Sequence, residues 1–252
     1  MRSELASFLL AIQFLTRFPV GSGDIYTSDR MATSVRYYPI VGALIGGLSA
    51  GVFCLANILF PVLITLLLAI AAGLLITGAF HEDGLADTFD GIGGGLTRDK
   101  ALSIMKDSRL GTYGTLALVT ALALKFMALI ALPLAFIPIA LIAGHGLSRL
   151  SSVLVIATSR YVRDEGTGKP VASGVSTASL VVVITTGTLI FALFCVWAPA
   201  VAALCGLAGL GIGHALMRLF FEPKLGGYTG DTLGAIQQAS EIGFYLGLVA
   251  WL

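Results

Sequence analysis

The sequence predicts an all-α, polytopic integral membrane protein with six to seven transmembrane helices and a short N-terminal interfacial or re-entrant helix. Hydrophobic residues make up 57% of the 252 residues and charged residues only 12%, whereas soluble domains carry about 25% charged residues. The apolar residues gather in runs of about 20, the length that a helix needs to cross a bilayer. Such runs must be helical because backbone polar groups in lipid need partners within the segment. We interpret residues 1–252 as one membrane-embedded domain.

The apolar runs follow one another along almost the whole chain. The first, residues 5–15, is too short to span and is therefore assigned to the interfacial or re-entrant helix. The spanning candidates are residues 37–59, 62–80, 113–132, 134–158, 178–197, 201–220 and 232–252. The last segment is less apolar than the others, and whether it inserts fully decides between six and seven crossings.

The connections between these runs alternate sharply in character. Three are short, uncharged and marked by proline, at residues 61, 133–138 and 199, whereas segments 17–36, 82–109, 160–169 and 218–231 hold nearly all ionisable residues. Because an excess of Lys and Arg marks the cytoplasmic side, we expect the charged loops to face the cytoplasm. The net charge of +1 gives no field that would attract nucleic acid, so membrane lipid is the expected surrounding and no nucleic-acid partner is predicted.

An acidic motif follows the second spanning candidate. Asp83, Asp87 and Asp90 are spaced i, i+4 and i+7, which places them within about 60° of one another on a helix. Three carboxylates on one face repel each other unless a cation lies among them. Oxygen ligands suit a hard ion such as Mg²⁺, which also binds substrate phosphates. The alternative is a solvated acidic face at the end of the second helix.

Residues on both sides of this motif could share its chemistry. His81 is a candidate general base for a hydroxyl nucleophile, and it could equally support or cap the acidic motif. Asp107 could complete the carboxylate cluster, and the guanidinium of Arg109 matches phosphate oxygens. Thr112 lies where the next spanning helix opens, and helix N-terminal amides can hold an anion. The alternative for this stretch is a surface helix with ordinary ion pairs.

The loop before the last helix is rich in glycine and contains Thr229, Gly230 and Asp231. Its backbone amides could bind a phosphate, or Thr229 or Asp231 could simply cap the helix; the residues do not decide between these roles. Residues 160–170 mix basic residues with glycine and could either grip a phosphate or anchor the chain at the cytoplasmic surface.

Two basic residues, Lys125 and Arg149, lie inside apolar runs. Such residues cost about 2.5 to 3.5 kcal/mol each at mid-helix, so we expect them to face a polar cavity and not lipid. The alternative is that their side chains extend to the membrane surface.

The motifs together resemble the cobalamin synthase (adenosylcobinamide-GDP ribazoletransferase) family. The acidic motif reads H-x-D-G-L-A-D-T-x-D-G at 81–91, and D-S-R-x-G-T-x-G follows at 107–114. The resemblance extends to F-L-T-R-F-P-V at 14–20, Y-P-I-V-G at 38–42 and G-G-x-T-G-D-T-L-G-A at 226–235. It therefore covers almost the whole chain.

The resemblance implies a Mg²⁺-dependent transferase of vitamin B12 (cobalamin) biosynthesis in a prokaryotic cytoplasmic (inner) membrane. Its substrates would be adenosylcobinamide-GDP and α-ribazole or α-ribazole 5′-phosphate, and its products adenosylcobalamin or its 5′-phosphate and GMP. Asp83, Asp87 and Asp90 would hold Mg²⁺ on the diphosphate. Arg109 with Lys125 or Arg149 would neutralise charge on the phosphates.

Two other functions compete with this interpretation. A CDP-alcohol phosphotransferase also places aspartates at a membrane-embedded Mg²⁺ site, but its pattern has arginine where this chain has Asp87. A solute transporter would place its coupling carboxylates near the membrane midplane, whereas the acidic residues here lie at one surface. The oligomeric state, the number of Mg²⁺ ions and the identity of the base are not determined by the sequence.

Overall fold

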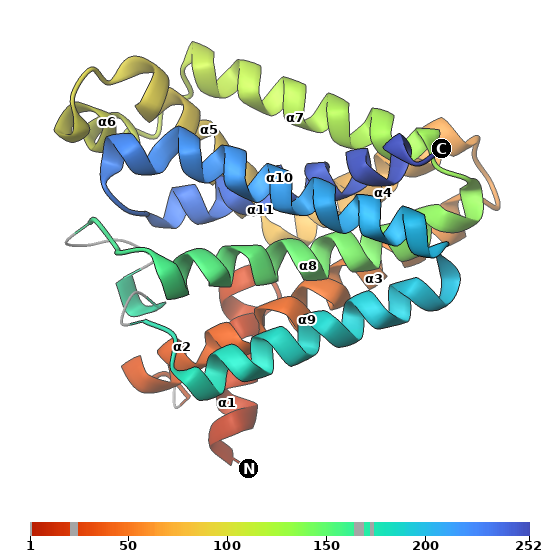
Figure 1. Ribbon diagram of the computed structural model, residues 1–252, viewed down its shortest axis with the longest axis horizontal. Helices are drawn as coiled ribbons and strands as arrows, with labels where there is room; N and C mark the ends of the chain where they lie inside the picture. Colours follow the sequence, from red (N-terminus) through yellow and green to blue (C-terminus); the bar gives the residue numbers. More distant parts are fainter. Residues whose placement is uncertain (1, 21–24, 164–168, 172–173) are drawn as a thin grey trace.

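The computed structural model in Figure 1 describes residues 2–20, 25–163, 169–171 and 174–252. Those residues form α-helices joined by short loops. The helices are α1 (Arg2–Leu15), α2 (Ser28–Ser34), α3 (Tyr38–Ala56), α4 (Val62–Thr77), α5 (Phe80–Gly94), α6 (Arg98–Ile104), α7 (Thr112–Ala131), α8 (Ile137–Thr158), α9 (Thr177–Trp197), α10 (Ala200–Leu225) and α11 (Gly230–Ala250). Single 3-10 turns cover Val35–Tyr37, Leu134–Phe136 and Lys169–Val171.

The all-helical, multi-pass architecture predicted from the sequence is confirmed. Among the described residues, five helical segments are long and apolar enough to cross a membrane, and six if the bent pair α4 and α5 is counted as one span. Their bounds differ from the predicted runs by a few residues. For example, α10 continues to Leu225, whereas the predicted run ended at residue 220. The helix α1 is apolar and shorter than a spanning helix, as an interfacial or re-entrant segment should be.

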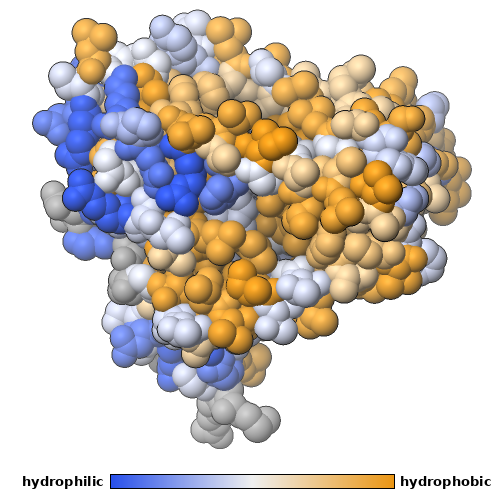
Figure 2. Space-filling model, in the orientation of Figure 1, coloured by the Kyte–Doolittle hydropathy of each residue, from blue (hydrophilic) through white to orange (hydrophobic). Residues whose placement is uncertain are grey.

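The polar residues gather at one end of the bundle. Figure 2 shows hydrophilic residues concentrated at the end where Figure 1 places α6 and the neighbouring loops, while most of the remaining visible surface is hydrophobic. A small backbone pairing helps to join two loops at this end. Val162 donates its N–H to the Tyr228 carbonyl at 3.0 Å, and Tyr228 donates to the Arg160 carbonyl at 2.8 Å.

The acidic motif occupies its own helix, which corrects the expectation that it lies at the end of the second spanning helix. Between α4 and α5 the chain turns by 85°. Both Gly78 and Ala79 adopt the left-handed conformation there, with φ of 66° and 56°. Glycine takes this conformation freely, but an L-residue such as Ala79 does so at a cost. The backbone N–H of Arg17 donates to the Ile76 carbonyl at 2.7 Å and supports the turn.

The helix α11 lies in the centre of the bundle, where it packs against α5, α7, α8 and α10. It is not among the helices that meet the length and apolarity expected of a span, because polar residues line its buried face. Its contact with α10 is close, since a Cβ on Gly209 would collide with the backbone of Gly243. This proximity lets α11 carry buried polar side chains into the interior without exposing them to lipid.

Candidate active site

The crossing of α5 and α11 brings acidic residues from two distant parts of the chain together. A Cβ on Gly84 would lie 2.6 Å from the Asp231 carbonyl oxygen, so only glycine permits this approach. Asp87, which is half-buried, interacts electrostatically with Asp231, Asp83 and Arg163. Arg163 forms an ion pair with Asp231 at 2.7 Å. The result is a cluster of three aspartates and one arginine at the charged end.

Within this cluster, Asp231 is paired with Arg163, which leaves Asp83 and Asp87 as the carboxylates most open to an added ion. Asp83 is exposed, and it follows directly after Glu82, whose side chain points into the protein. The two aspartates are one helical turn apart and therefore lie on the same face of α5.

The third predicted metal ligand, Asp90, has a different environment. It is only 7% exposed, and its two carboxylate oxygens accept backbone N–H groups from Gly111 at 2.7 Å and Gly114 at 2.8 Å. These amides belong to the first turn of α7, which lacks a side-chain cap of its own. Asp90 therefore caps α7 from outside the helix, where a negative charge also complements the helix dipole.

The residues that precede α7 lie at the surface. Arg109 donates to both carboxylate oxygens of Asp107, and its side chain is 87% exposed. This pairing lowers the pKa of Asp107 to about 2. Thr112 is exposed at the start of α7. The structure thus does not bring Asp107 into contact with the aspartates of α5, and it leaves the Arg109 guanidinium facing outward.

The structure of the glycine-rich loop before α11 shows which residue caps that helix. The Thr229 hydroxyl accepts the N–H of Thr232 at 3.3 Å, and the Thr232 hydroxyl accepts the N–H of Thr229 at 2.9 Å. This is a capping box, so Thr229 is the helix cap. Gly230 is the first residue of α11. Residues 164–168 of the basic loop considered as a phosphate site lie outside the described residues.

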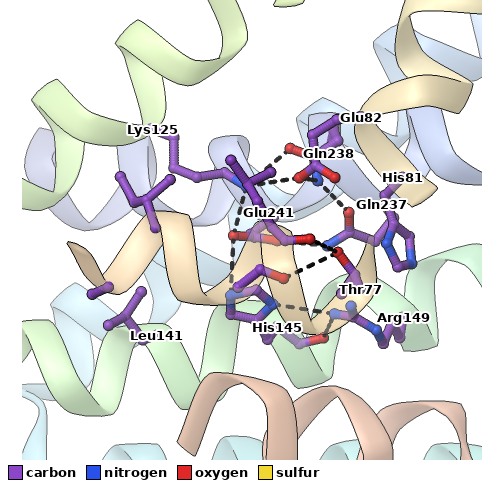
Figure 3. Close-up of a pocket in the computed structure, with 14 residues that line it drawn as sticks. Thr77, His81, Glu82, Lys125, Leu141, His145, Arg149, Gln237, Gln238 and Glu241 are labelled. Atoms are coloured by element: carbon purple, nitrogen blue, oxygen red, sulfur yellow. Dashed lines mark hydrogen bonds and ion pairs between the residues drawn. The ribbon is translucent and has the colours of Figure 1, made fainter. Parts of the chain in front are cut away.

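Beneath the charged end, Lys125 lies in a buried polar network, as Figure 3 shows. Its ammonium group donates to Gln238 Oε1 at 2.9 Å and forms an ion pair with Glu241 Oε1 at 3.1 Å. Glu82 Oε1 is 3.9 Å from the same nitrogen and accepts the Gln238 side-chain amide at 2.8 Å. Lys125 is only 5% exposed, so the expectation that it avoids lipid is confirmed.

Arg149 occupies the neighbouring part of the same network. It is 1% exposed, and its guanidinium donates to the His145 carbonyl at 2.9 Å and lies 3.3 Å from His145 Nδ1. The other ring nitrogen of His145 lies 3.7 Å from Glu241. Glu241 is fully buried and also accepts hydrogen bonds from Gln237 and Tyr245. Arg149 is therefore held inside the protein, as expected.

The network encloses a cavity of about 20 Å³ that is lined by Lys125, Arg149, Glu82, Glu241 and His81, among others. A volume of this size accommodates about one water molecule. His81 is 5% exposed and its ring lies against Phe80 at 5.4 Å. The cavity is thus too small for a nucleotide, and His81 faces it from the first turn of α5.

Sequence reasoning missed Glu241, Gln237 and Gln238 as partners of the intramembrane cations. A signal for them exists, because three polar residues within five positions of an otherwise apolar segment are uncommon in a spanning helix. The acidic motif H-x-D-G leaves position 82 unspecified, whereas the buried side chain of Glu82 joins α5 to α11.

The fit of this site to Mg²⁺ rests on its donor atoms. The described residues contain no group of three His, Cys, Asp or Glu side chains arranged to hold a metal ion. Mg²⁺, however, usually binds through one or two carboxylates, retained waters and substrate phosphates, and does not need a complete protein cage. Asp83 and Asp87 supply two such carboxylates at the charged end, so the residues present fit the ion.

Comparison with known proteins identifies the family. The family model described as cobalamin-5-phosphate synthase matches residues 7–249. The chain belongs to this family. Proteins named adenosylcobinamide-GDP ribazoletransferase are similar along their whole length: that of Shewanella frigidimarina is 46% identical over 98% of this chain and 95% of its own. The protein of Leptothrix cholodnii is 42% identical over 98% of this chain and 96% of its own length. The protein of Shewanella woodyi is 40% identical over 100% of this chain and 98% of its own length. No solved structure matches the chain.

Proposed function

We propose that this chain is a membrane-embedded adenosylcobinamide-GDP ribazoletransferase. It transfers the adenosylcobinamide phosphate moiety of adenosylcobinamide-GDP to α-ribazole or α-ribazole 5′-phosphate and releases GMP. The observation that carries the proposal is the 46% identity to a relative of that name over 98% of the chain. The sequence resemblance and the family match agree on this reaction, and neither favours a CDP-alcohol phosphotransferase or a transporter.

In this reaction a hydroxyl oxygen of the acceptor forms a new bond to phosphorus, and the bond between that phosphorus and the oxygen of GMP breaks. GMP leaves with the electron pair, and the hydroxyl proton passes to a base. Positioning and neutralisation of charge account for most of the catalysis in transfers of this type. The protein therefore needs groups that hold a diphosphate and groups that balance its negative charge.

Asp83 and Asp87 are the residues that would hold Mg²⁺ at the charged end. When bound there, the ion would offset the charge of the diphosphate. Arg109 and Arg163 would add positive charge at the same end, and exposed Arg109 is free to exchange Asp107 for a phosphate. His81, in the first turn of the same helix, remains the candidate for the base. Asp231 and Gly230 lie beside them at the start of α11.

The proposed location is a prokaryotic cytoplasmic membrane with the charged end in the cytoplasm. Most basic residues lie in the four charged connections of the sequence, which is the distribution expected for cytoplasmic loops. Nucleotide substrates and Mg²⁺ would reach the aspartates from that side. Lys125 and Arg149 would lie below them, within the membrane.

The test is a reconstituted assay with purified protein, adenosylcobinamide-GDP and either form of the acceptor, in which GMP and the corrinoid product are quantified. We expect equal amounts of both products, dependence on Mg²⁺, and no release of CMP when CDP-alcohols replace the donor. Comparing α-ribazole with its 5′-phosphate identifies the acceptor. Absence of GMP release with both acceptors would refute the proposal.

A further inference from the structure

Neighbouring residues at the start of α5 point in opposite directions. Glu82 is 8% exposed and bonds to Gln238 of α11 at 2.8 Å, whereas Asp83 is exposed at the charged end. Successive residues of a helix are rotated by about 100°, so a single turn can place one carboxylate inside and the next outside. The internal contact therefore fixes the rotation of the same turn that carries Asp83.

The internal contact extends to a third helix through Lys125. Its ammonium group, from the middle of α7, contacts Gln238 and Glu241 of α11 and lies 3.9 Å from Glu82 of α5. An ammonium group has three N–H donors and no acceptor. Two of the three oxygens around this one lie within hydrogen-bond distance and the third, on Glu82, lies at 3.9 Å, so Lys125 links α7 to both α5 and α11.

The helix α5 depends on such contacts because it does not continue α4. The chain turns by 85° between the two helices, and the rest of α5 is tied to α7 by Asp90. Glu82 and Asp90 thus anchor α5 on both sides of the segment that contains Asp83 and Asp87. Loss of either anchor lets this segment rotate or shift relative to α11 and Asp231.

On this basis, and resting on the proposed function, we infer that Glu82, Lys125 and Gln238 are positioning residues. They touch no substrate, and they hold α5 so that Asp83 and Asp87 lie against the start of α11. A displacement of these two carboxylates weakens their shared hold on a metal ion such as Mg²⁺, which demands near-ideal ligand geometry. The role differs from the phosphate-neutralising role that the sequence suggested for Lys125.

The test compares Glu82→Leu, which removes the contact with Gln238, with Glu82→Gln, which keeps an acceptor oxygen for the same amide. Glu222→Gln is the control, because Glu222 pairs with Arg218 within α10, outside the contacts of Glu82, Lys125 and Gln238. The first measurement is binding of Mn²⁺ alone to each metal-free protein by electron paramagnetic resonance. The second is GMP release as a function of Mg²⁺ concentration.

We expect Glu82→Leu to bind Mn²⁺ at least 10-fold more weakly and to need at least 10-fold more Mg²⁺ for half-maximal turnover. Its turnover at saturating Mg²⁺ should stay within about fivefold of the unmodified protein. Glu82→Gln should restore both constants to within threefold, and Glu222→Gln should leave them unchanged. Unaltered Mn²⁺ binding by Glu82→Leu overturns the inference, and so does a large loss of turnover that neither Mg²⁺ nor Glu82→Gln restores.

A second variant and the unmodified protein distinguish failure of the positioning role from misfolding and from failure of the proposed function. If Glu82→Leu does not purify as a monodisperse helical protein, Gln238→Met replaces it, since it removes the amide that bonds Glu82 and leaves the Lys125–Glu241 ion pair in place, and the same changes are expected. Unmodified protein that binds Mn²⁺ but releases no GMP refutes the proposed function and leaves the positioning role standing. Unmodified protein that binds no Mn²⁺ overturns the positioning role.

Discussion

Replacing Asp90 with asparagine tests whether this residue stabilises α7 or serves only as a metal ligand. Asp90 accepts N–H groups of Gly111 and Gly114 at 2.7 and 2.8 Å, and hydrogen bonds to a charged group contribute about 1.5 to 3 kcal/mol each. Asparagine keeps one acceptor oxygen, which retains one neutral bond of about 1 kcal/mol. The expected loss in the free energy of unfolding is therefore about 2 to 5 kcal/mol.

For a chain of this size, each kcal/mol corresponds to a shift in Tm of about 2 to 4 °C. Asp90→Asn should therefore lower Tm by about 4 to 20 °C. The assay is thermal unfolding in detergent with EDTA present, so that no divalent ion contributes. Asp83→Asn is the matched control, because Asp83 is exposed on the same helix and its removal should leave Tm almost unchanged. Equal melting temperatures for the two variants would refute the capping role.

Three further predictions follow from the charged end and the helix packing. Arg109 holds the pKa of Asp107 at about 2, so the stabilisation from this pair is present above the ordinary pKa of an aspartate and is lost as the pH falls through the lowered pKa. Arg109→Gln should raise the pKa of Asp107, measured by NMR titration, toward about 3.9. An unchanged pKa would contradict this. Gly84→Ala should destabilise by about 1 to 3 kcal/mol through overpacking against α11, unlike Gly47→Ala, whose Cβ would meet nothing within 4 Å. Asp99→Cys, at a position 92% exposed, should react with an impermeant maleimide in inside-out vesicles but not in intact cells, in a cysteine-free background; labelling of intact cells would reverse the proposed orientation.

The fold could be predicted from the sequence because length and apolarity determine spanning helices directly. The run that contains Lys125 and the run that contains Arg149 were both placed correctly, and the cost of burying a charge in lipid predicted that both residues face inward. These conclusions depend only on local composition and on the bilayer thickness.

The sequence carries no comparable signal for the bend between α4 and α5, which precedes the acidic motif. Gly78 is a common helix terminator, but nothing in the sequence indicates that Ala79 also adopts a left-handed conformation. The surrounding contacts impose it, among them the backbone bond from Arg17 to Ile76. For that reason the aspartates were expected on the end of α4, whereas they lie on a separate helix.

The partners of the buried charges could not be predicted because they are distant in the chain. Lys125 and Gln238 are separated by 113 residues, and Glu82 and Gln238 by 156. Asp90 presents the same difficulty, since its partners are backbone amides, which carry no sequence signature. The i, i+4, i+7 spacing of Asp83, Asp87 and Asp90 predicted a shared helix face, but it did not reveal that Asp90 bonds to the backbone of α7.

The most direct test of the account is the release of GMP from adenosylcobinamide-GDP by purified protein, with unmodified chain and Asp87→Ala assayed in parallel. The account predicts Mg²⁺-dependent GMP release that requires α-ribazole or its 5′-phosphate, and loss of that release in Asp87→Ala although the variant remains folded and inserted. Equal turnover by Asp87→Ala and the unmodified chain would contradict the assignment of the site.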